Sequence, residues 1–315
     1  MSRAAETLAS IPLATRFAMA LCVLTYSCQI LLDPPISDYA LNPSRILRRW
    51  EFYRLVTGAL FHANMMHILM NTTSTMAIGG MLERRIGTLM TIFTIAWGTI
   101  LTSSTYVLVS WLMYVVFGYE GLMLRNCVGF SGVIFQLSVL ESNIGPEDRT
   151  RSVFGMVEVS SRAYPWALLL ALQFIMPQAS LLGHLAGILV GTMQCRGVLD
   201  AIFPSDAWLR GYEASGGRLV EWPGYVAVVT PETRRGGTVA SSCCRGGGVV
   251  PSVVAGARER VRVAIFGRGA DANANVQMDA LLGAAWGSGD VVADVEDDDE
   301  WAGLPAAIQR STEDR

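Results

Sequence analysis

Long apolar stretches alternate with short groups of charged residues over the first 200 positions of the chain. Three apolar segments, 12–32, 62–82 and 88–117, reach the length of about 20 residues that a helix needs to cross a bilayer. Three shorter apolar segments follow at 128–142, 164–176 and 180–197. The pattern predicts an all-α polytopic membrane protein with six transmembrane helices.

The fourth and fifth segments are too short to cross a bilayer unaided. If the fourth helix starts near Gly129, the chain before it must enter the protein as irregular backbone. Such backbone survives at membrane depth only where it lines a cavity or is buried in protein. The first turn of this helix, which holds Ser131, would then open into a water-filled space. Its free amides and positive dipole end would favour an oxyanion there.

Composition agrees with a membrane protein and separates a C-terminal tail. The chain is 51% hydrophobic and 16% charged, and its net charge of -3 offers no basic surface for nucleic acid. Six helices place both termini on one side, and the arginines near the helix ends indicate that this side is cytosolic. We expect residues 1–203 to form the transmembrane domain. Residues 204–315, rich in Gly, Ser, Ala and Arg, predict a cytosolic and largely disordered tail.

Ionisable and nucleophilic side chains lie within the apolar segments. His62 and His67 occur in LFHANMMHILMN, His184 in LLGHLAGILVG and Ser131 in VGFSGVIFQL. Because such groups are costly in a bilayer, those retained there indicate a functional site. Ser131 and His184 are a candidate nucleophile and general base. His67 and Asn71, four residues apart on one helix face, are candidate hydrogen-bond donors.

Small residues could bring the nucleophile and the base together. The sixth helix carries a glycine every four residues, at Gly183, Gly187 and Gly191. Such a stripe allows close packing against a second helix. If that helix is the fourth, with its own glycines Gly129 and Gly132, the two side chains reach hydrogen-bonding distance.

Two alternatives stay open from spacing alone. The glycines could only pack the helices, with His184 bonded to a backbone carbonyl. The three histidines could instead form a metal site, but no carboxylate or thiolate has the spacing to complete a ligand set. We therefore expect neither a metal nor a cofactor.

Four motifs in order resemble the rhomboid intramembrane serine proteases. They are FYRLVTGALFHANMMHILMN, GGMLERRIGT, VGFSGVIFQL and GHLAGILVG, spread from about residue 48 to 197. Their wording is most similar to the subgroup of endoplasmic-reticulum rhomboids that resemble rhomboid domain-containing protein 1. The resemblance implies a six-helix rhomboid bundle.

The resemblance also implies a role for each motif residue. Ser131 would be the nucleophile and His184 the base, while the Ser131 amide, His67 and Asn71 would stabilise the oxyanion. Many rhomboids stack a tyrosine on the catalytic histidine, and this chain has Phe135 at that position. Structural support would come from Arg54, Glu83, Gly187 and Gly191. We also expect Gly129, Gly132 and Phe135 to support the site, and His62 to be a structural or rim residue.

We expect an intramembrane serine endopeptidase that cleaves transmembrane proteins within the lipid bilayer. The subgroup resemblance implies the endoplasmic reticulum membrane, with cytosolic termini, and a role in membrane-protein quality control. The alternative is a non-catalytic rhomboid-like protein that binds clients for extraction. The presence of both Ser131 and His184 favours the protease.

The tail contains two short motifs that suggest protein partners. Residues 296–314 resemble a ubiquitin-interacting motif, with Ala307 and Ser311 on one helical face. Phe266, Gly267 and Gly269 resemble a short motif that recruits an AAA ATPase. The alternatives are an acidic solvating terminus and a glycine-rich turn without a partner.

Overall fold

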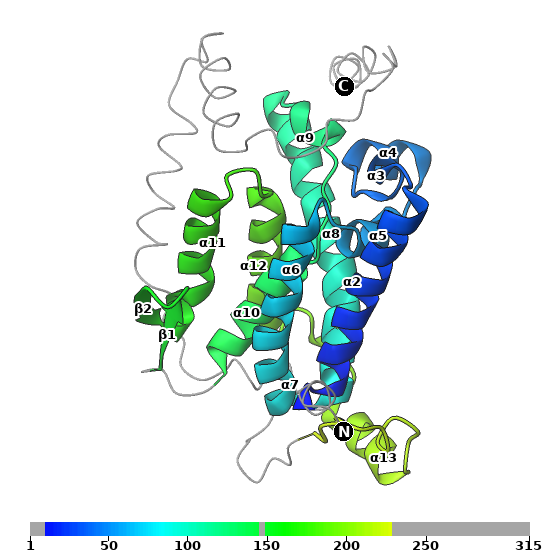
Figure 1. Cartoon of the computed structure of the whole chain (residues 1–315), viewed down its shortest axis with the longest axis vertical. Coiled ribbons are helices and arrows are strands. Elements are labelled where there is room, and N and C mark those ends of the chain that lie inside the picture. The colour runs from blue at the N-terminus through cyan, green and yellow to red at the C-terminus, as the bar shows by residue number, and fades with distance from the viewer. Residues whose placement is uncertain (1–9, 145–148, 229–315) are drawn as a thin grey trace, which may run out of the picture.

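The computed structural model describes residues 10–144 and 149–228, which form a mainly helical bundle (Figure 1). Within these ranges the α-helices are α2 (Leu13–Leu32), α3 (Ile36–Tyr39), α4 (Pro43–Arg49), α5 (Arg54–Leu60), α6 (Met65–Ser74), α7 (Gly80–Ile86), α8 (Thr88–Phe117), α9 (Gly121–Leu124), α10 (Ser131–Asn143), α11 (Tyr164–Ile175), α12 (Leu181–Cys195) and α13 (Asp206–Ala214). A π-helical turn η1 (Thr75–Gly79), the short helices η2 (Ser161–Ala163) and η3 (Asp200–Ile202), and an antiparallel hairpin of β1 (Thr150–Val153) and β2 (Val157–Ser160) complete the description.

Five of the predicted apolar segments correspond to α2, α8, α10, α11 and α12, with ends within three residues. The remaining predicted segment, 62–82, corresponds to the continuous helical run of α6, η1 and α7 over residues 65–86, which starts three residues later than predicted. The side chain of Asn64 caps α6 by accepting a hydrogen bond from the His67 amide, so residues 61–64 are outside the helix. The π-helical turn η1 then separates α6 from α7.

Two of the described helices, Leu13–Leu32 and Thr88–Phe117, are long and apolar enough to cross a membrane. A third span results if α12 is counted together with the segment 200–214, from which it is bent by 86°. The apolar helices indicate a membrane protein, while the number of six spans stays a prediction.

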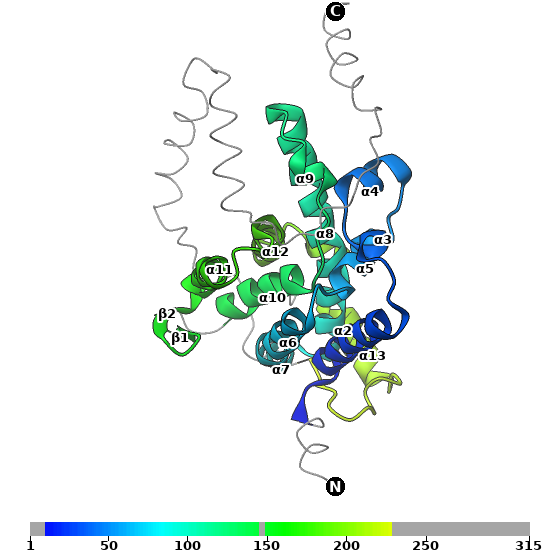
Figure 2. The ribbon, with the colours of Figure 1, turned by 45° about the horizontal axis from the view of Figure 1, so that its top comes forward.

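Helix α10 lies at the centre of the bundle and contacts α8, α11, α12 and the α6–η1 segment (Figure 2). Its side chains from Val133 to Ser142 are all buried, which is expected of a helix surrounded by others. Glycines bring α12 against it. A Cβ atom on Gly187 would overlap the carbonyl oxygen of Gly132, and one on Gly191 would lie 2.8 Å from Cβ of Val139.

Two buried charged residues, Glu83 and Arg54, connect helices in different regions of the bundle through hydrogen bonds. The carboxylate of Glu83, in α7, accepts hydrogen bonds from the amides of Ala14 and Thr15 and from the hydroxyl of Thr88. It thereby satisfies free amides at the start of α2 and ties α7 to α2 and α8.

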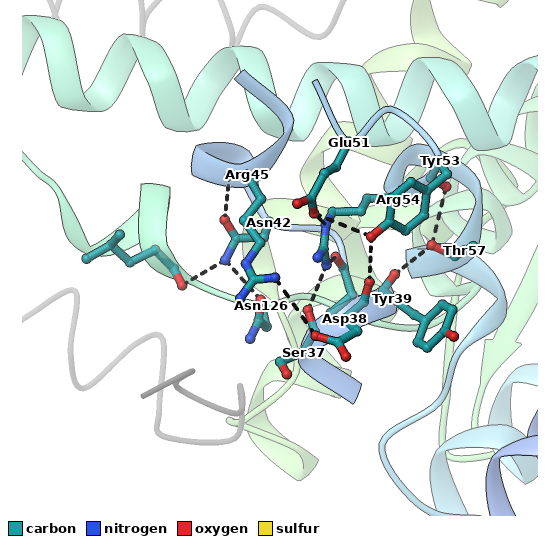
Figure 3. A network of polar contacts seen from close by, with 12 residues as sticks. Ser37, Asp38, Tyr39, Asn42, Arg45, Glu51, Tyr53, Arg54, Thr57 and Asn126 are labelled. Carbon is teal, nitrogen blue, oxygen red and sulfur yellow. Dashed lines mark hydrogen bonds and ion pairs between the residues drawn. The ribbon is translucent and has the colours of Figure 1, made fainter. Parts of the chain in front are cut away.

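Arg54, in α5, braces the α3–α5 region (Figure 3). Its guanidinium is fully buried and donates to Glu51 at 2.5 Å and to the carbonyl oxygens of Ser37 at 2.7 Å and Ala40 at 2.8 Å. A buried charge is tolerated only when paired and hydrogen-bonded, as it is here. Arg54 therefore fixes the connection between α2 and α5.

The described structure extends beyond the predicted domain boundary at residue 203. Helix α13 and residues 217–228 pack against the bundle, which corrects the prediction of a tail starting at 204 for this part. The amide of Thr88 donates to the Val226 carbonyl at 2.8 Å, and the amide of Leu13 donates to the Gly224 carbonyl at 2.9 Å.

Burial and the adjacent Glu213 carboxylate raise the pKa of Tyr225, so its hydroxyl stays protonated and donates to that carboxylate. The tail motifs at 266–269 and 296–314 lie outside the described residues.

Candidate active site

The candidate site starts with the irregular chain that leads into α10. Leu41 and Cys127 exchange two backbone hydrogen bonds of 2.9 Å, and the Gly129 amide donates to the Gly58 carbonyl at 2.8 Å. These bonds satisfy the backbone where it is not helical, as membrane depth requires. They also fix the position at which α10 begins, at Ser131.

Asn42 holds the same segment from the side of α4 (Figure 3). Its amide group donates to Oδ1 of Asn126 at 2.9 Å and to the Leu124 carbonyl at 3.2 Å, while its oxygen caps α4 at the Arg45 amide. Sequence reasoning did not identify Asn42 or Asn126, because the pairing joins residues 84 positions apart.

Gly129 allows α6 to approach the start of α10. Its φ of +118° is a conformation that side chains rarely adopt, and an added Cβ would lie 2.5 Å from Cε1 of His67. The same atom would be 3.4 Å from Nδ2 of Asn71. Glycine therefore leaves the room that places the polar side chains of α6 beside the first turn of α10.

Ser131 and His184 meet across the α10–α12 contact. The distance between Ser131 Oγ and His184 Nε2 is 2.9 Å, a hydrogen-bond distance. His184 is 4% exposed, and the ring of Phe135 stacks on its imidazole with centroids 4.5 Å apart. Packing against Phe135 thus restricts the orientation of the imidazole that faces the serine hydroxyl.

Side chains of α6 that can donate hydrogen bonds line the cavity beside Ser131. His67 and Asn71 border the same cavity as Ser131 and His184. Nδ2 of Asn71 is buried and has no hydrogen-bond partner among the described residues. An unpartnered buried donor costs free energy, so this amide is available to an oxygen atom bound in the cavity.

His62 is fully buried and does not line the cavity, so it is not at the rim of the site. Its Nδ1 is 2.9 Å from the Leu60 carbonyl oxygen, and its ring centroid is 5.1 Å from that of His67. Gln29 of α2 bonds both backbone groups of His62, donating to the carbonyl at 3.1 Å and accepting from the amide at 3.0 Å. Sequence reasoning missed Gln29, although a glutamine in an apolar segment is the kind of signal that identified the histidines.

The three histidines are divided between two contacts, His62 with His67 and His184 with Ser131. Within residues 10–144 and 149–228, no group of three or more His, Cys, Asp or Glu side chains is placed to hold a metal ion. The serine, the histidine and the nearby donors are instead the groups that acyl transfer requires.

Comparison with known proteins shows what the chain is similar to. Residues 49–199 match the rhomboid domain. The chain contains a rhomboid domain. It is 30% identical over 213 residues to Rhomboid-like protein 15 of Arabidopsis thaliana and 33% identical over 200 residues to Rhomboid-related protein 4 of Pongo abelii. It is also 28% identical over 204 residues to Rhomboid-type serine protease 2 of Gibberella zeae.

The matches cover part of each protein. They span 65%, 62% and 60% of this chain, and 52%, 62% and 72% of the three relatives in the same order. The similar proteins include one named as a serine protease. The pair Ser131 and His184, called the dyad below, and the donors Asn71 and His67 all lie within the matched residues 49–199. Gln29 and the segment 204–228 lie outside them.

Proposed function

We propose that this rhomboid protein is an intramembrane serine endopeptidase. The observation that supports the proposal most directly is the distance of 2.9 Å between Ser131 Oγ and His184 Nε2 at the N-terminus of α10. A hydroxyl is a weak nucleophile unless an adjacent base takes its proton. His184 is the base in contact with it.

The reaction proceeds in two halves. His184 Nε2 takes the proton of Ser131 Oγ as this oxygen attacks a peptide carbonyl carbon, and a tetrahedral oxyanion forms. His184 then gives the proton to the leaving amine, the C–N bond breaks, and an acyl-enzyme remains. In the second half a water molecule loses a proton to His184, attacks the ester and releases the carboxylic acid and the serine hydroxyl.

The oxyanion is stabilised from two directions. The first-turn amides of α10 have no acceptor within their own helix and carry the positive end of its dipole. Asn71 Nδ2, without a partner among the described residues, and the ring of His67 border the cavity from α6. Fixed donors of this kind lower the barrier because they need no reorganisation as charge develops.

We expect the substrates to be transmembrane proteins, since the motif resemblance implies an intramembrane protease and the residues that line the cavity come largely from apolar helices. A substrate helix must unwind near the cut, because its carbonyl groups are otherwise hydrogen-bonded. We place the protein in the endoplasmic reticulum membrane with cytosolic termini and assign it to membrane-protein quality control, on the motif resemblance and the arginine distribution.

The test is cleavage of a single-span substrate by the purified protein in proteoliposomes. Ser131→Ala and His184→Ala should each abolish cleavage, and Ser131→Ala should also abolish labelling by a fluorophosphonate. The matched control is Ser138→Ala, which removes a buried hydroxyl of the same helix outside the cavity. Cleavage that persists in Ser131→Ala would contradict the proposal, and client turnover without cleavage would support the non-catalytic alternative.

A further inference from the structure

The β1–β2 hairpin ends in a turn that is unfavourable for its sequence. Phe154 and Gly155 occupy the two central positions with φ of +51° and +73°, and the Met156 amide donates to the Val153 carbonyl at 3.0 Å. Hairpin turns with positive φ at both central positions normally contain Asn, Asp or Gly there. A bulky residue in this conformation is uncommon, and strained residues occur preferentially at functional sites.

The hairpin is fixed to the bundle through a buried carboxylate. Glu141, at the end of α10, is fully buried and pairs with Arg149 at 2.8 Å and with Arg151 of β1. The guanidinium of Arg151 also lies 4.3 Å from the ring centroid of Tyr164, at the start of α11. The hairpin that contains Phe154 is therefore anchored to the end of α10 and to α11, and β1 and β2 lie beside α11 (Figure 1).

The turn reaches the cavity that contains the dyad. Phe154 lines the same cavity as Ser131 and His184, and the side chains of Leu168 and Leu172 of α11 line it as well. The cavity therefore extends from the N-terminus of α10 to the hairpin. Phe154 is 46% exposed, so its ring presents apolar surface that the rest of the described chain does not cover.

We infer that Phe154 is a substrate-binding residue that contacts the transmembrane segment of the substrate on the hairpin side of the cleaved bond. This rests on the proposed protease function. The occupant is an apolar peptide segment, because Phe154, Leu168 and Leu172 offer apolar surface and the cavity is continuous with the dyad. The ring adds apolar contact to binding of the segment, and does not touch the reacting atoms.

The experiment compares Phe154→Gly with Phe154→Leu in the full-length protein in proteoliposomes. Glycine removes the ring and suits the positive φ, so the variant should unfold at or above the wild-type temperature. With a single-span substrate, KM should rise roughly tenfold in Phe154→Gly and less in Phe154→Leu, which retains apolar bulk. The loss in kcat/KM should exceed any loss in the fluorophosphonate labelling rate by about the same factor, because the label reports on the dyad alone.

The control is Met156→Ala, which changes a 75% exposed residue of the same hairpin outside the cavity and should keep the wild-type KM. A wild-type KM in Phe154→Gly, or an equal fall of labelling and cleavage, would overturn the inference while leaving the protease proposal intact. If the wild-type protein neither cleaves nor is labelled, it is the proposed function that fails, and the inference with it.

Discussion

At the scale of single residues, the candidate chemistry depends on which buried polar atoms remain without partners. Nδ2 of Asn71 has none among the described residues, whereas Gln29 uses both its amide nitrogen and its oxygen. A buried donor without an acceptor costs roughly 1–3 kcal/mol. That cost is offset if the donor binds an oxyanion during the reaction.

Asn71→Ala should therefore lower kcat by about two orders of magnitude with little change in KM, since the donor acts on charge that develops in the transition state. Steady-state cleavage in proteoliposomes measures both constants. Thr73→Ala, an exposed position of the same helix outside the cavity, is the control and should behave as wild type. A loss confined to KM would instead assign Asn71 to ground-state binding.

At the scale of secondary-structure elements, backbone contact between α10 and α12 sets the distance between Ser131 and His184. No side chain separates the helices at Gly132 and Gly187. Small residues allow this approach, and bilayer helices gain from it through close packing. The spacing of the glycines along the chain indicated such a contact but did not identify the partner helix.

Gly187→Ala should push the two helices apart, because its Cβ would overlap the Gly132 carbonyl oxygen. We expect a loss of about 1–3 kcal/mol in the free energy of unfolding, together with reduced cleavage. Gly211→Ala, in α13, is the matched control, because nothing lies within 4 Å of the added atom. It should stabilise its helix by about 0.5–1 kcal/mol. Thermal unfolding in detergent distinguishes the two, and equal effects would contradict the packing argument.

Helix α2 reaches the site through Gln29. Gln29→Ala would leave both backbone groups of His62 without their buried partner and free the loop that supports the His67 ring. We expect kcat to fall more than KM rises, and Gln29→Glu, which can still accept from the His62 amide, to be intermediate. Cys28→Ala changes the adjacent exposed residue and serves as control. An unchanged kcat in Gln29→Ala would show that α2 has only a structural role.

At the scale of the whole molecule, the segment 204–228 belongs to the folded unit although it follows the matched rhomboid domain. It supplies partners for the amides of Leu13 and Thr88, at the starts of α2 and α8. Helix starts have free amides that need acceptors, and this segment provides backbone carbonyls for them.

Truncation after residue 228 keeps all of these hydrogen bonds, whereas truncation after residue 203 removes them. The shorter protein should unfold at a temperature lower by roughly 5 °C or more, which corresponds to a loss of about 2 kcal/mol in a domain of this size. Thermal unfolding of both proteins in the same detergent is the measurement. Equal unfolding temperatures would show that the segment contributes nothing to stability.

The sequence by itself determined where most helices lie and which family of proteins the chain resembles. Both depend on local patterns: five apolar segments match helices within three residues, and the motifs from 48 to 197 fall in the matched rhomboid domain. The start of α6 at Met65 and the π-helical turn at 75–79 were not predicted, because a cap and a π-helical turn hardly alter hydropathy.

Only the tertiary structure decided which side chains meet. The bond between Ser131 and His184 joins residues 53 positions apart, and the bonds between Gln29 and His62 join residues 33 apart. Hydropathy and spacing carry no information on such pairings, because they depend on how the helices pack. The same holds for Phe154, whose place in the cavity results from the anchoring of a hairpin at Glu141.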